Sequence, residues 1–372
     1  MQFGLNQEQI LLRDAVSAFT RDRYGDCERR KYRDLRWGYS EENWQFLAQL
    51  GVLGLLLPSE VGGLGGGPKE LITVMEVLGG AFAVEPILEE VVVTAGLLAK
   101  AGSPQQKEQW LGKVISGHAH LALAHFEQRA RFQLSNVQVQ ARVQGDRTVL
   151  KGHKTLVSMA ASADQWIVSA LERPDAVADG SAIGLYLVSP TAPGIERRDF
   201  RLVDGSIASA VEFNSVATNG RLPGGFRDLA AVFDTARLAA GAEMVGIMST
   251  LFSSTVEFLK NRKQFGVALA SLQVLQHRLA DLYVMLEQSR SQLYRAVTCV
   301  GSGPIAERSI AGMKSYISRA AIAIGEECVH LHGGIGMTDD LPLGHGYKRL
   351  VLLANLFGDA NSELMRFNKL AC

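Results

Sequence analysis

Cysteine is scarce in this chain of 372 residues, and its four cysteines, Cys27, Cys299, Cys328 and Cys372, lie far apart. No two of them form a CxxC pair, which argues against a zinc knuckle, a dithiol redox motif and a disulfide framework. The pattern is typical of a protein from a reducing compartment, and we expect it in the cytoplasm.

An excess of charge of either sign is also missing. Lys plus Arg and Asp plus Glu number 38 each, which gives a formal net charge of 0. This balance provides no electrostatic reason to expect nucleic acid or an anionic membrane as a partner. The N-terminal segment has no basic cap followed by a continuous apolar run, so we expect neither a signal peptide nor a membrane span.

Hydrophobic residues, by contrast, make up 47% of the chain, and its length favours two or three domains. The N-terminal part is predicted to be helical. Residues 6–9 (NQEQ) resemble a capping box and precede apolar residues at helical spacing. Further helices are predicted over 42–50 and 69–78, and two more beyond Glu85, separated by a break at 102–104.

The central part of the chain changes to short runs rich in β-branched residues, punctuated by turn signals such as Gly145-Asp146 and Pro193-Gly194. The runs are LALAHF from 121, the alternating stretch 137–143, TVLKGHKTLVS from 148, QWIVSALE from 165, AIGLYLVS from 182 and SAVEFNSV from 209. They predict a compact antiparallel sheet or barrel of roughly six to eight strands. No helix-length pattern lies between the strands, so a Rossmann sheet is not expected.

Long helices return after Pro223. The segment 231–259 is apolar on nearly every side, which predicts a helix buried between others. Leucines from 272 to 293 keep a three-four spacing on a second helix, and a third is predicted over 305–332, ending at Gly333. The predicted fold class is therefore α+β, with a helical domain over 1–117, a β domain over 118–225 and a C-terminal four-helix bundle over 226–372.

Three motif-like features carry little chemistry. GGLGGG at 62–67 lacks the lysine of a P-loop, and no strand precedes it, which favours a flexible turn. The His-x-His pairs at 118 and 330 have no cysteine or carboxylate nearby to complete a usual ligand set, so no metal is expected. Ser206 and Ser209 lack the context of a nucleophile elbow.

Two segments are more informative: NRKQFG at 261–266 with ASLQVLQHRLAD at 270–281, and HLHGGIGMT at 330–338. Each alone is explained by a helix end, a loop or a glycine cap. In this order, on a frame that runs helical, β, helical, they resemble the acyl-CoA dehydrogenase family. The resemblance covers essentially the whole chain, because LPSEVGGLG at 57–65 and QKEQWL at 106–111 are similar to the family's P-E-x-x-G-G-x-G and Q-K-x-x-W/Y-L segments.

The resemblance implies that FAD binds across a subunit interface. It assigns seven residues near the C-terminus to the cofactor: Arg262, Gln264, Phe265, Gln273, His330, Gly333 and Gly334. Arg262 would pair with the diphosphate through charge-assisted hydrogen bonds. The backbone from His330 to Gly334 would approach the adenosine half, which glycine permits, and His330 stands where the family usually has Gln.

In the β domain, KTLVS at 154–158 resembles the family's K-x-W-I-T stretch, whose hydroxyl contacts the flavin. Ser158 is the expected donor. Leu156 replaces the tryptophan, and FEQR at 126–129 replaces the usual G-x-G-S-D loop.

The family's reaction removes a proton beside the thioester carbonyl while hydride leaves the next carbon for the flavin, so a positioned carboxylate is expected. Most members place this glutamate in a Y-E-G-T segment, where this chain reads LFGDA at 356–360; a minority place it before an arginine, where this chain has Ala236 before Arg237. Asp359 and Glu243 are the remaining candidates. Asp359 is one methylene shorter than glutamate, and Glu243, about two helical turns beyond Ala236, has the alternative role of a paired structural carboxylate.

The stretch 337–350 with 357–360 is similar to a bacterial branch of the family that often works as paired unlike subunits on steroid side chains and other bulky acyl-CoAs. The resemblance implies α,β-desaturation of an acyl-CoA thioester by one subunit of a heteromer, with an electron-transferring flavoprotein as acceptor. Two alternatives stay open. One is a self-sufficient homo-oligomer that uses Asp359 or Glu243 as base, and the other is a non-catalytic protein that keeps the fold for assembly or ligand binding.

Overall fold

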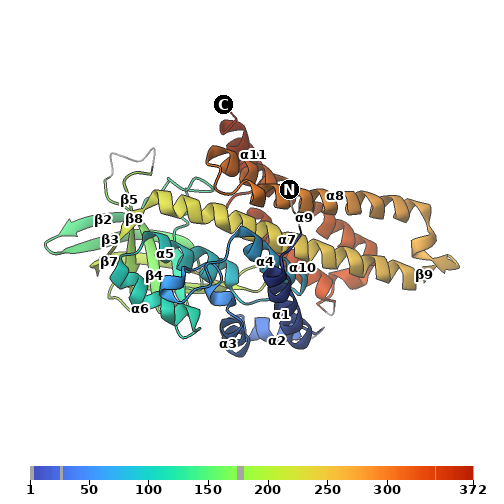
Figure 1. Ribbon diagram of the computed structural model, residues 1–372, viewed down its shortest axis with the longest axis horizontal. Helices are drawn as coiled ribbons and strands as arrows, with labels where there is room; N and C mark the ends of the chain where they lie inside the picture. The colour runs from blue at the N-terminus through green and yellow to red at the C-terminus, as the bar shows by residue number, and fades with distance from the viewer. Residues whose placement is uncertain (1–3, 26–27, 174–179, 340, 372) are drawn as a thin grey trace. The chain divides into compact units, whose positions relative to one another are not determined.

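The computed structural model describes residues 4–25, 28–173, 180–339 and 341–371. Its element order is seen in Figure 1. Two compact units can be separated, and each is discontinuous in sequence. The helical unit comprises Met1–Arg29, Pro68–Ala83 and Arg237–Cys372, and the sheet unit comprises Arg30–Gly67 and Val84–Ala236. The division of the sequence into three domains stays a prediction.

Local capping signals set the N-terminal helices of the helical unit. Helix α1 (Gln7–Arg23) begins at the predicted capping box: Gln9 N donates to Asn6 Oδ1 at 2.8 Å, and Asn6 N donates to Gln9 Oε1 at 2.9 Å. Helix α4 (Pro68–Gly80) starts with proline, whose missing N–H costs nothing at that position. Both predicted helices are confirmed.

The sheet unit begins with short helices: α2 (Glu28–Asp34, which starts in the helical unit), α3 (Glu41–Gln49), the 3₁₀ turns η1 (Val52–Gly54) and η2 (Ser59–Val61), α5 (Gly96–Ala101) and α6 (Pro104–Ile115). The predicted break at 102–104 is confirmed. Ser103 caps α6 by accepting a hydrogen bond from Gln106 N at 3.2 Å. The sequence did not predict η3 (Ile87–Ala95), a π-helix that runs directly into α5.

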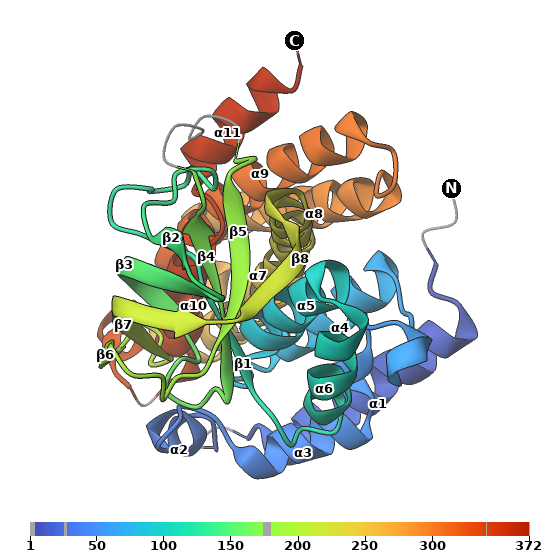
Figure 2. The ribbon, with the colours of Figure 1, turned by 90° about the vertical axis from the view of Figure 1, so that its left-hand side faces the viewer.

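The sheet contains eight strands among the described residues: β1 (Leu121–Ala124), β2 (Gln140–Gln144), β3 (Arg147–Ser158), β4 (Gln165–Leu171), β5 (Ile183–Val188), β6 (Ile195–Arg201), β7 (Ile207–Thr218) and β8 (Gly220–Gly225). Their order is β6-β7-β3-β2-β4-β5-β8, with β1 beside β4 (Figure 2). Most pairings are antiparallel, as predicted, whereas β1 and β2 each pair with β4 in parallel.

The sheet is open, so the barrel that the sequence also allowed is not formed. In the described chain no pairing joins its edge strands β6 and β8. Their composition gives the physical reason. Strand β6 (IERRDFR) is charged and exposed, and β8 (GRLPGG) contains a proline that cannot donate to a further strand. The sequence pattern missed both strands because neither shows alternating hydrophobicity.

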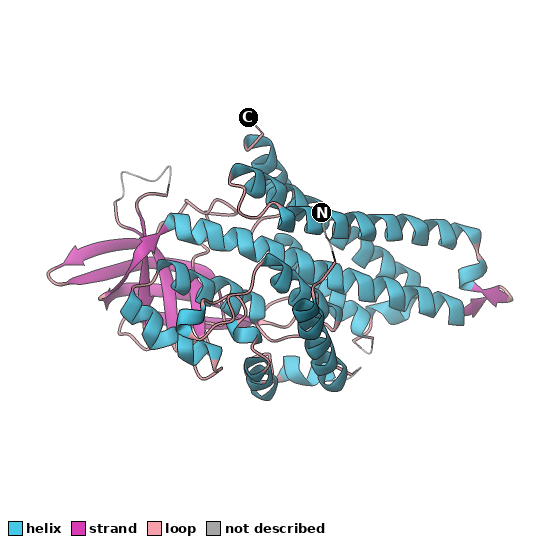
Figure 3. Ribbon diagram, in the orientation of Figure 1, coloured by secondary structure: helices cyan, strands magenta, loops and turns pink. Residues whose placement is uncertain are grey.

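Long helices complete the helical unit: α7 (Phe226–Asn261, whose first turns lie in the sheet unit), α8 (Gln273–Thr298), α9 (Pro304–His332), α10 (Pro342–Asn355) and α11 (Ala360–Lys369), with 3₁₀ turns η4 (Leu269–Ser271) and η5 (Gly333–Met337). Residues 236–248 of α7 are all buried, which confirms the prediction for the middle of that helix. The short strands β9 (Lys263–Gln264) and β10 (Val267–Ala268) form a hairpin between α7 and α8 (Figure 3). No helix in the described ranges has the length and apolar character needed to cross a membrane.

Glycines permit a close crossing of α4 and α7 inside the helical unit. A Cβ atom added to Gly246 would overlap the carbonyl oxygen of Glu76, and one added to Gly79 would overlap that of Glu243. The two backbones therefore touch at this crossing, and any side chain there would separate them.

Candidate functional site

The β9–β10 hairpin presents several of the residues assigned by motif. Phe265 at its tip has a positive φ of 54° and is 89% exposed, and Gln264 is exposed beside it. Arg262 is fixed through its backbone, since Leu269 N donates to its carbonyl oxygen at 2.9 Å. Its guanidinium makes no hydrogen bond or ion pair with any residue that the structure describes. The hairpin thus offers a cation and an aromatic ring to a molecule outside this chain.

The C-terminus of α9 presents a glycine backbone. Gly333 caps the helix with a φ of 68°, in the region that favours glycine, and its N–H donates to the His330 carbonyl. A Cβ atom added to Gly333 or Gly334 would meet no heavy atom within 4 Å, so the space beside this backbone is open.

The structure places the two segments at the same end of the helical unit. The Phe258 ring, near the end of α7, stacks on His332 with a centroid distance of 4.3 Å. Arg278, in the second turn of α8, donates from Nη2 to His330 Nδ1 over 2.9 Å and pairs with Glu327. Because a guanidinium only donates, Nδ1 of His330 is the acceptor in this bond.

Phe258 was not predicted because no motif includes it. Arg278 lies within the segment 270–281 but was assigned no role, because its contacts join helices far apart in sequence. Gln273 begins α8 one and a half turns before Arg278 and is exposed. A guanidinium, exposed amides, a phenyl ring and open glycine backbone suit an anionic dinucleotide, so the residues present fit FAD.

Ser158 lies in the sheet unit as the last residue of β3, half-buried and in register with Ala208 of β7. Leu156 forms an isolated bridge with Phe126, and Thr155 N donates to the Phe126 carbonyl at 2.9 Å. The Phe126 ring stacks on Phe233, with ring planes 4° apart. The segment 126–129, which replaces the family's glycine loop, therefore packs beside β3 through Phe126.

A buried polar cluster anchors that segment. The Lys154 Nζ donates to Glu127 Oε1 at 2.7 Å, to Ser169 Oγ at 3.0 Å and to the His125 carbonyl at 3.1 Å. His125 Nδ1 shares a 2.9 Å hydrogen bond with Ser169 Oγ. Burial, assisted by the nearby Lys154 charge, lowers the pKa of His125 to about 3, and burial lowers the pKa of Lys154 to about 8 despite Glu127. His125 is thus neutral at physiological pH.

Replacing His125 with glutamine is expected to remove part of the acid sensitivity of folding. The unfolded chain protonates His125 near pH 6.5, whereas the folded chain does so only near pH 3, so this residue lowers the free energy of unfolding as the pH falls through that window. Between pH 7 and 5 the loss is about 2 kcal/mol. Urea unfolding at both pH values measures it. Equal pH dependence in the two proteins contradicts the assignment.

The two candidate bases are both engaged in structural contacts. Asp359 is the N-cap of α11, where its Oδ1 accepts from Ser362 N at 2.7 Å. Glu243, only 5% exposed, accepts from Arg349 Nε at 2.6 Å and Nη2 at 3.2 Å. For Glu243, this structural role is the alternative that the sequence had already indicated. For Asp359, the sequence DANSE at 359–363 is typical of a helix N-cap.

The positions at which the family places its glutamate are apolar here. In the alignment of LFGD with Y-E-G-T, Phe357 takes the place of the glutamate; it is 5% exposed and has a φ of 62°. Ala236, at the alternative position, is fully buried. No described side chain at either position can accept a proton.

A buried lysine and a buried ion pair fix the loop between α10 and α11. The Lys314 Nζ donates to the carbonyl oxygens of Leu353 and Gly358, both at 2.9 Å. Arg237 Nε donates to Glu363 Oε1 at 2.9 Å, and both side chains are nearly fully buried. The Glu363 carboxylate lies where a side chain on Gly358 would be. These contacts hold the loop that carries Phe357.

Two family models match this chain. One described as "Acyl-CoA dehydrogenase, N-terminal domain" matches residues 6–118, and one described as "Acyl-CoA dehydrogenase, C-terminal domain" matches residues 224–369. Mitochondrial isovaleryl-CoA dehydrogenase from Pongo abelii is 28% identical over 375 residues, which cover 98% of this chain and 88% of that protein. Acyl-CoA dehydrogenase FadE27 from Mycobacterium tuberculosis is 27% identical over 340 residues, covering 89% of this chain and 88% of that protein.

Solved structures give the same result for the whole fold. A variant of the Tcur3481–Tcur3483 steroid ACAD superposes with a TM-score of 0.88 at 28% identity, covering 98% of each chain. The ChsE4–ChsE5 complex from Mycobacterium tuberculosis gives a TM-score of 0.90 at 26% identity, covering 99% of this chain and 98% of that one.

The matched segments span most of the chain, and the superpositions extend over both units. They confirm the resemblance found in the motifs. The chain belongs to the acyl-CoA dehydrogenase family, whose members are FAD-dependent oxidoreductases that act on CH–CH groups.

Proposed function

We propose that this protein is one subunit of a heteromeric acyl-CoA dehydrogenase whose catalytic carboxylate is supplied by a different chain. The observation that carries the proposal is the pair of apolar, buried residues, Phe357 and Ala236, at the positions where the family places its base. The chemistry that bound FAD supplies is acceptance of the hydride leaving the β-carbon, while a carboxylate removes the α-proton.

A self-sufficient enzyme is disfavoured by the state of the remaining carboxylates. For Asp359 to act as base, it would have to release the Ser362 N–H and uncap α11. For Glu243 to act as base, its two hydrogen bonds with Arg349 would have to break. A guanidinium that loses these bonds inside the protein is costly in free energy. Both carboxylates are therefore already used in structural contacts.

The residues toward FAD are the part of the site that this chain contributes. Arg262 would hold the diphosphate, with Gln264, Phe265 and Gln273 beside it, and the backbone at Gly333 and Gly334 would hold the adenosine half. Ser158 would donate to the flavin ring. These residues bind and orient the cofactor, so the subunit is required even without its own base.

A second subunit is further supported by the surface of α8. The predicted leucine stripe is buried at Leu282, Leu286 and Leu293 but only half-buried at Leu272, Leu275 and Leu279. Nearby on the same helix, Val274 is 63% exposed, and Tyr283 and Val284 are more than half exposed. A stripe of this kind is typical of an interface that another chain covers.

The proposed substrate and electron acceptor rest on similarity, and the proposed location rests on the cysteine pattern. One solved relative, Tcur3481–Tcur3483, is described as a steroid ACAD, and another is described as the ChsE4–ChsE5 complex. We therefore propose a steroid side chain or another bulky acyl-CoA thioester as substrate, and an electron-transferring flavoprotein as acceptor. The separated cysteines favour the cytoplasm as location.

The test is to express the chain alone and together with an acyl-CoA dehydrogenase chain from the same organism that keeps the catalytic glutamate, and to record visible spectra. We expect a colourless protein alone and a yellow complex that is bleached by a bulky acyl-CoA. A yellow homo-oligomer bleached by an acyl-CoA would show instead that the chain is self-sufficient. A yellow complex that no acyl-CoA bleaches would favour a non-catalytic role.

Replacing Arg262 with methionine is expected to weaken FAD binding by the assembled protein by about 10- to 100-fold. The loss of a charge-assisted bond to the diphosphate, worth about 1.5–3 kcal/mol, accounts for this range. Flavin fluorescence during dialysis measures the retained cofactor. Arg295→Met, at an exposed arginine near the end of α8, is the matched control and should bind FAD normally. Equal retention in both variants refutes the role of Arg262.

A further inference from the structure

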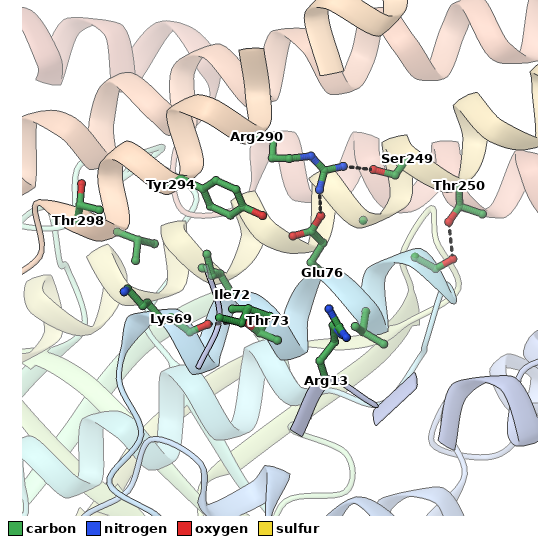
Figure 4. Close-up of a pocket in the computed structure, with 15 residues that line it drawn as sticks. Arg13, Lys69, Ile72, Thr73, Glu76, Ser249, Thr250, Arg290, Tyr294 and Thr298 are labelled. Atoms are coloured by element: carbon green, nitrogen blue, oxygen red, sulfur yellow. Dashed lines mark hydrogen bonds and ion pairs between the residues drawn. The ribbon is translucent and has the colours of Figure 1, made fainter. Parts of the chain in front are cut away.

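The helical unit contains a cavity of about 450 Å³ lined by residues of α1, α4, α7 and α8 (Figure 4). Its volume lies within the range of small-molecule sites. None of its lining residues is among those assigned to FAD or to the base. Any molecule bound in it would therefore be separate from the cofactor and from the candidate bases.

One wall of the cavity is a satisfied polar network. Arg290 pairs with Glu76 and donates to Ser249 Oγ at 3.0 Å. Burial raises the pKa of the Glu76 carboxyl in spite of Arg290. Thr250, farther along α7, donates to the Gly80 carbonyl at 2.8 Å. These groups are already partnered, so they shape the wall and add no net charge to it.

The rim of the cavity, by contrast, carries uncompensated positive charge. Figure 4 shows Lys69 and Thr298 on one side of the view, Thr250 on the opposite side, and Arg13 below Glu76 and Arg290. The Lys69 amine is exposed and makes no contact with a carboxylate among the described residues. Arg13 is bonded to Asp14, at 2.8 Å. Among the described residues that line the cavity, Lys69 is therefore the cation that has no carboxylate partner.

The remaining surface is apolar or backbone. Ile72 and Val77 of α4 and Val297 of α8 provide aliphatic walls. Gly80 and Gly246, at the close crossing of the two helices, add no side chains to the lining. An apolar body fits along these walls, and an anionic group fits the end that carries Lys69.

We propose that this cavity binds a monocarboxylate with an apolar body, its carboxylate paired with Lys69 and its body between α4 and α8. Recognition combines burial of apolar surface with one ion pair at the rim. A neutral or cationic compound of the same shape lacks that pair, so the site discriminates by charge.

The test uses a medium-chain carboxylate that carries a diazirine near its apolar end, added to the FAD-loaded protein, in complex with its partner where FAD requires one. After illumination, mass spectrometry locates the label. We expect labelling of α4 and α8, competed by octanoate, and at least tenfold weaker labelling by the corresponding primary amide. Label confined to other segments, or equal labelling by the amide, overturns the proposal.

Three variants sharpen the test. Lys69→Glu reverses the charge at the rim, and a glutamate is well tolerated in the first turn of α4, so labelling there should fall at least tenfold while FAD content is unchanged. Thr298→Trp, at an exposed position, should block the entrance. Lys151→Glu, at an exposed lysine of β3, is the matched charge reversal and should label like the parent. Unaltered labelling in Lys69→Glu refutes the ion pair.

Discussion

Replacing Glu363 with alanine is expected to lower the free energy of unfolding by about 3–5 kcal/mol, the cost of breaking a buried ion pair. Glu363 and Arg237 are 2% and 3% exposed, and the bond between them measures 2.9 Å. The substitution removes a carboxylate from beside a guanidinium that water cannot reach. Urea unfolding, followed by far-ultraviolet circular dichroism, measures the loss.

A double variant distinguishes the lost pair from a lost volume. In Arg237→Met with Glu363→Leu neither charge remains, so we expect stability to recover by at least 1–2 kcal/mol relative to Glu363→Ala. Glu257→Ala, which removes an exposed partner of Lys260, should change stability by no more than about 0.5 kcal/mol. Additive losses in the double variant would contradict the buried pair as the cause.

This ion pair also bears on the proposed catalytic deficiency. Arg237 follows Ala236, Glu363 packs against Gly358, and Phe357 lies next to that glycine. The ion pair therefore adjoins both positions from which the base is missing, through Arg237 beside Ala236 and through Glu363 against the loop that carries Phe357. Buried hydrogen bonds hold the loop in place although no catalytic carboxylate is found at the family's position. This is what we expect of a subunit whose active site is completed by another chain.

Replacing Gly246 with alanine is expected to destabilise the helical unit by about 3 kcal/mol or more, because the new methyl group would overlap the backbone of Glu76 and lie 2.8 Å from Gly80 N. No rotamer change relieves a clash with backbone, so α4 must move away from α7. Thermal unfolding measures the effect.

Gly112→Ala is the matched control within α6. A Cβ atom there meets nothing within 4 Å, so we expect a gain of about 0.5–1 kcal/mol from the reduced freedom of the unfolded chain. A Gly246→Ala protein as stable as the parent would show that the helices do not touch at this crossing.

The sequence predicted those elements that are specified by local signals. The start of helix α1 was found through its capping box and the end of α9 through its glycine, since both signals act within one turn. Strands β6 and β8 were missed because an edge strand needs only a neighbouring backbone, and IERRDFR and GRLPGG show no alternation. The π-helix η3 was missed because hydropathy does not distinguish it from an α-helix.

In the candidate site, too, the sequence predicted the residues that stand in local motifs but not the contacts that depend on tertiary packing. Arg262 and Gly333 stand in short motifs, whereas the bond between Arg278 and His330 joins residues 52 positions apart and depends on how α8 packs on α9. Lys314 is one of several charges on an amphipathic helix, and its role was missed because most of its partners are backbone carbonyls, which no side-chain pattern reveals. Asp359 was predicted only as a candidate base, and its role as the N-cap of α11 was recognised from the structure.

The helical unit is assembled from both ends of the chain, which has a consequence for synthesis on the ribosome. The apolar residues of α4 leave the ribosome long before Gly246 and the rest of α7 have been translated. They therefore stay without their packing partner while the whole sheet is synthesised. We expect a nascent chain halted before residue 237 to recruit chaperones through α4, and to release them once α7 has left the exit tunnel.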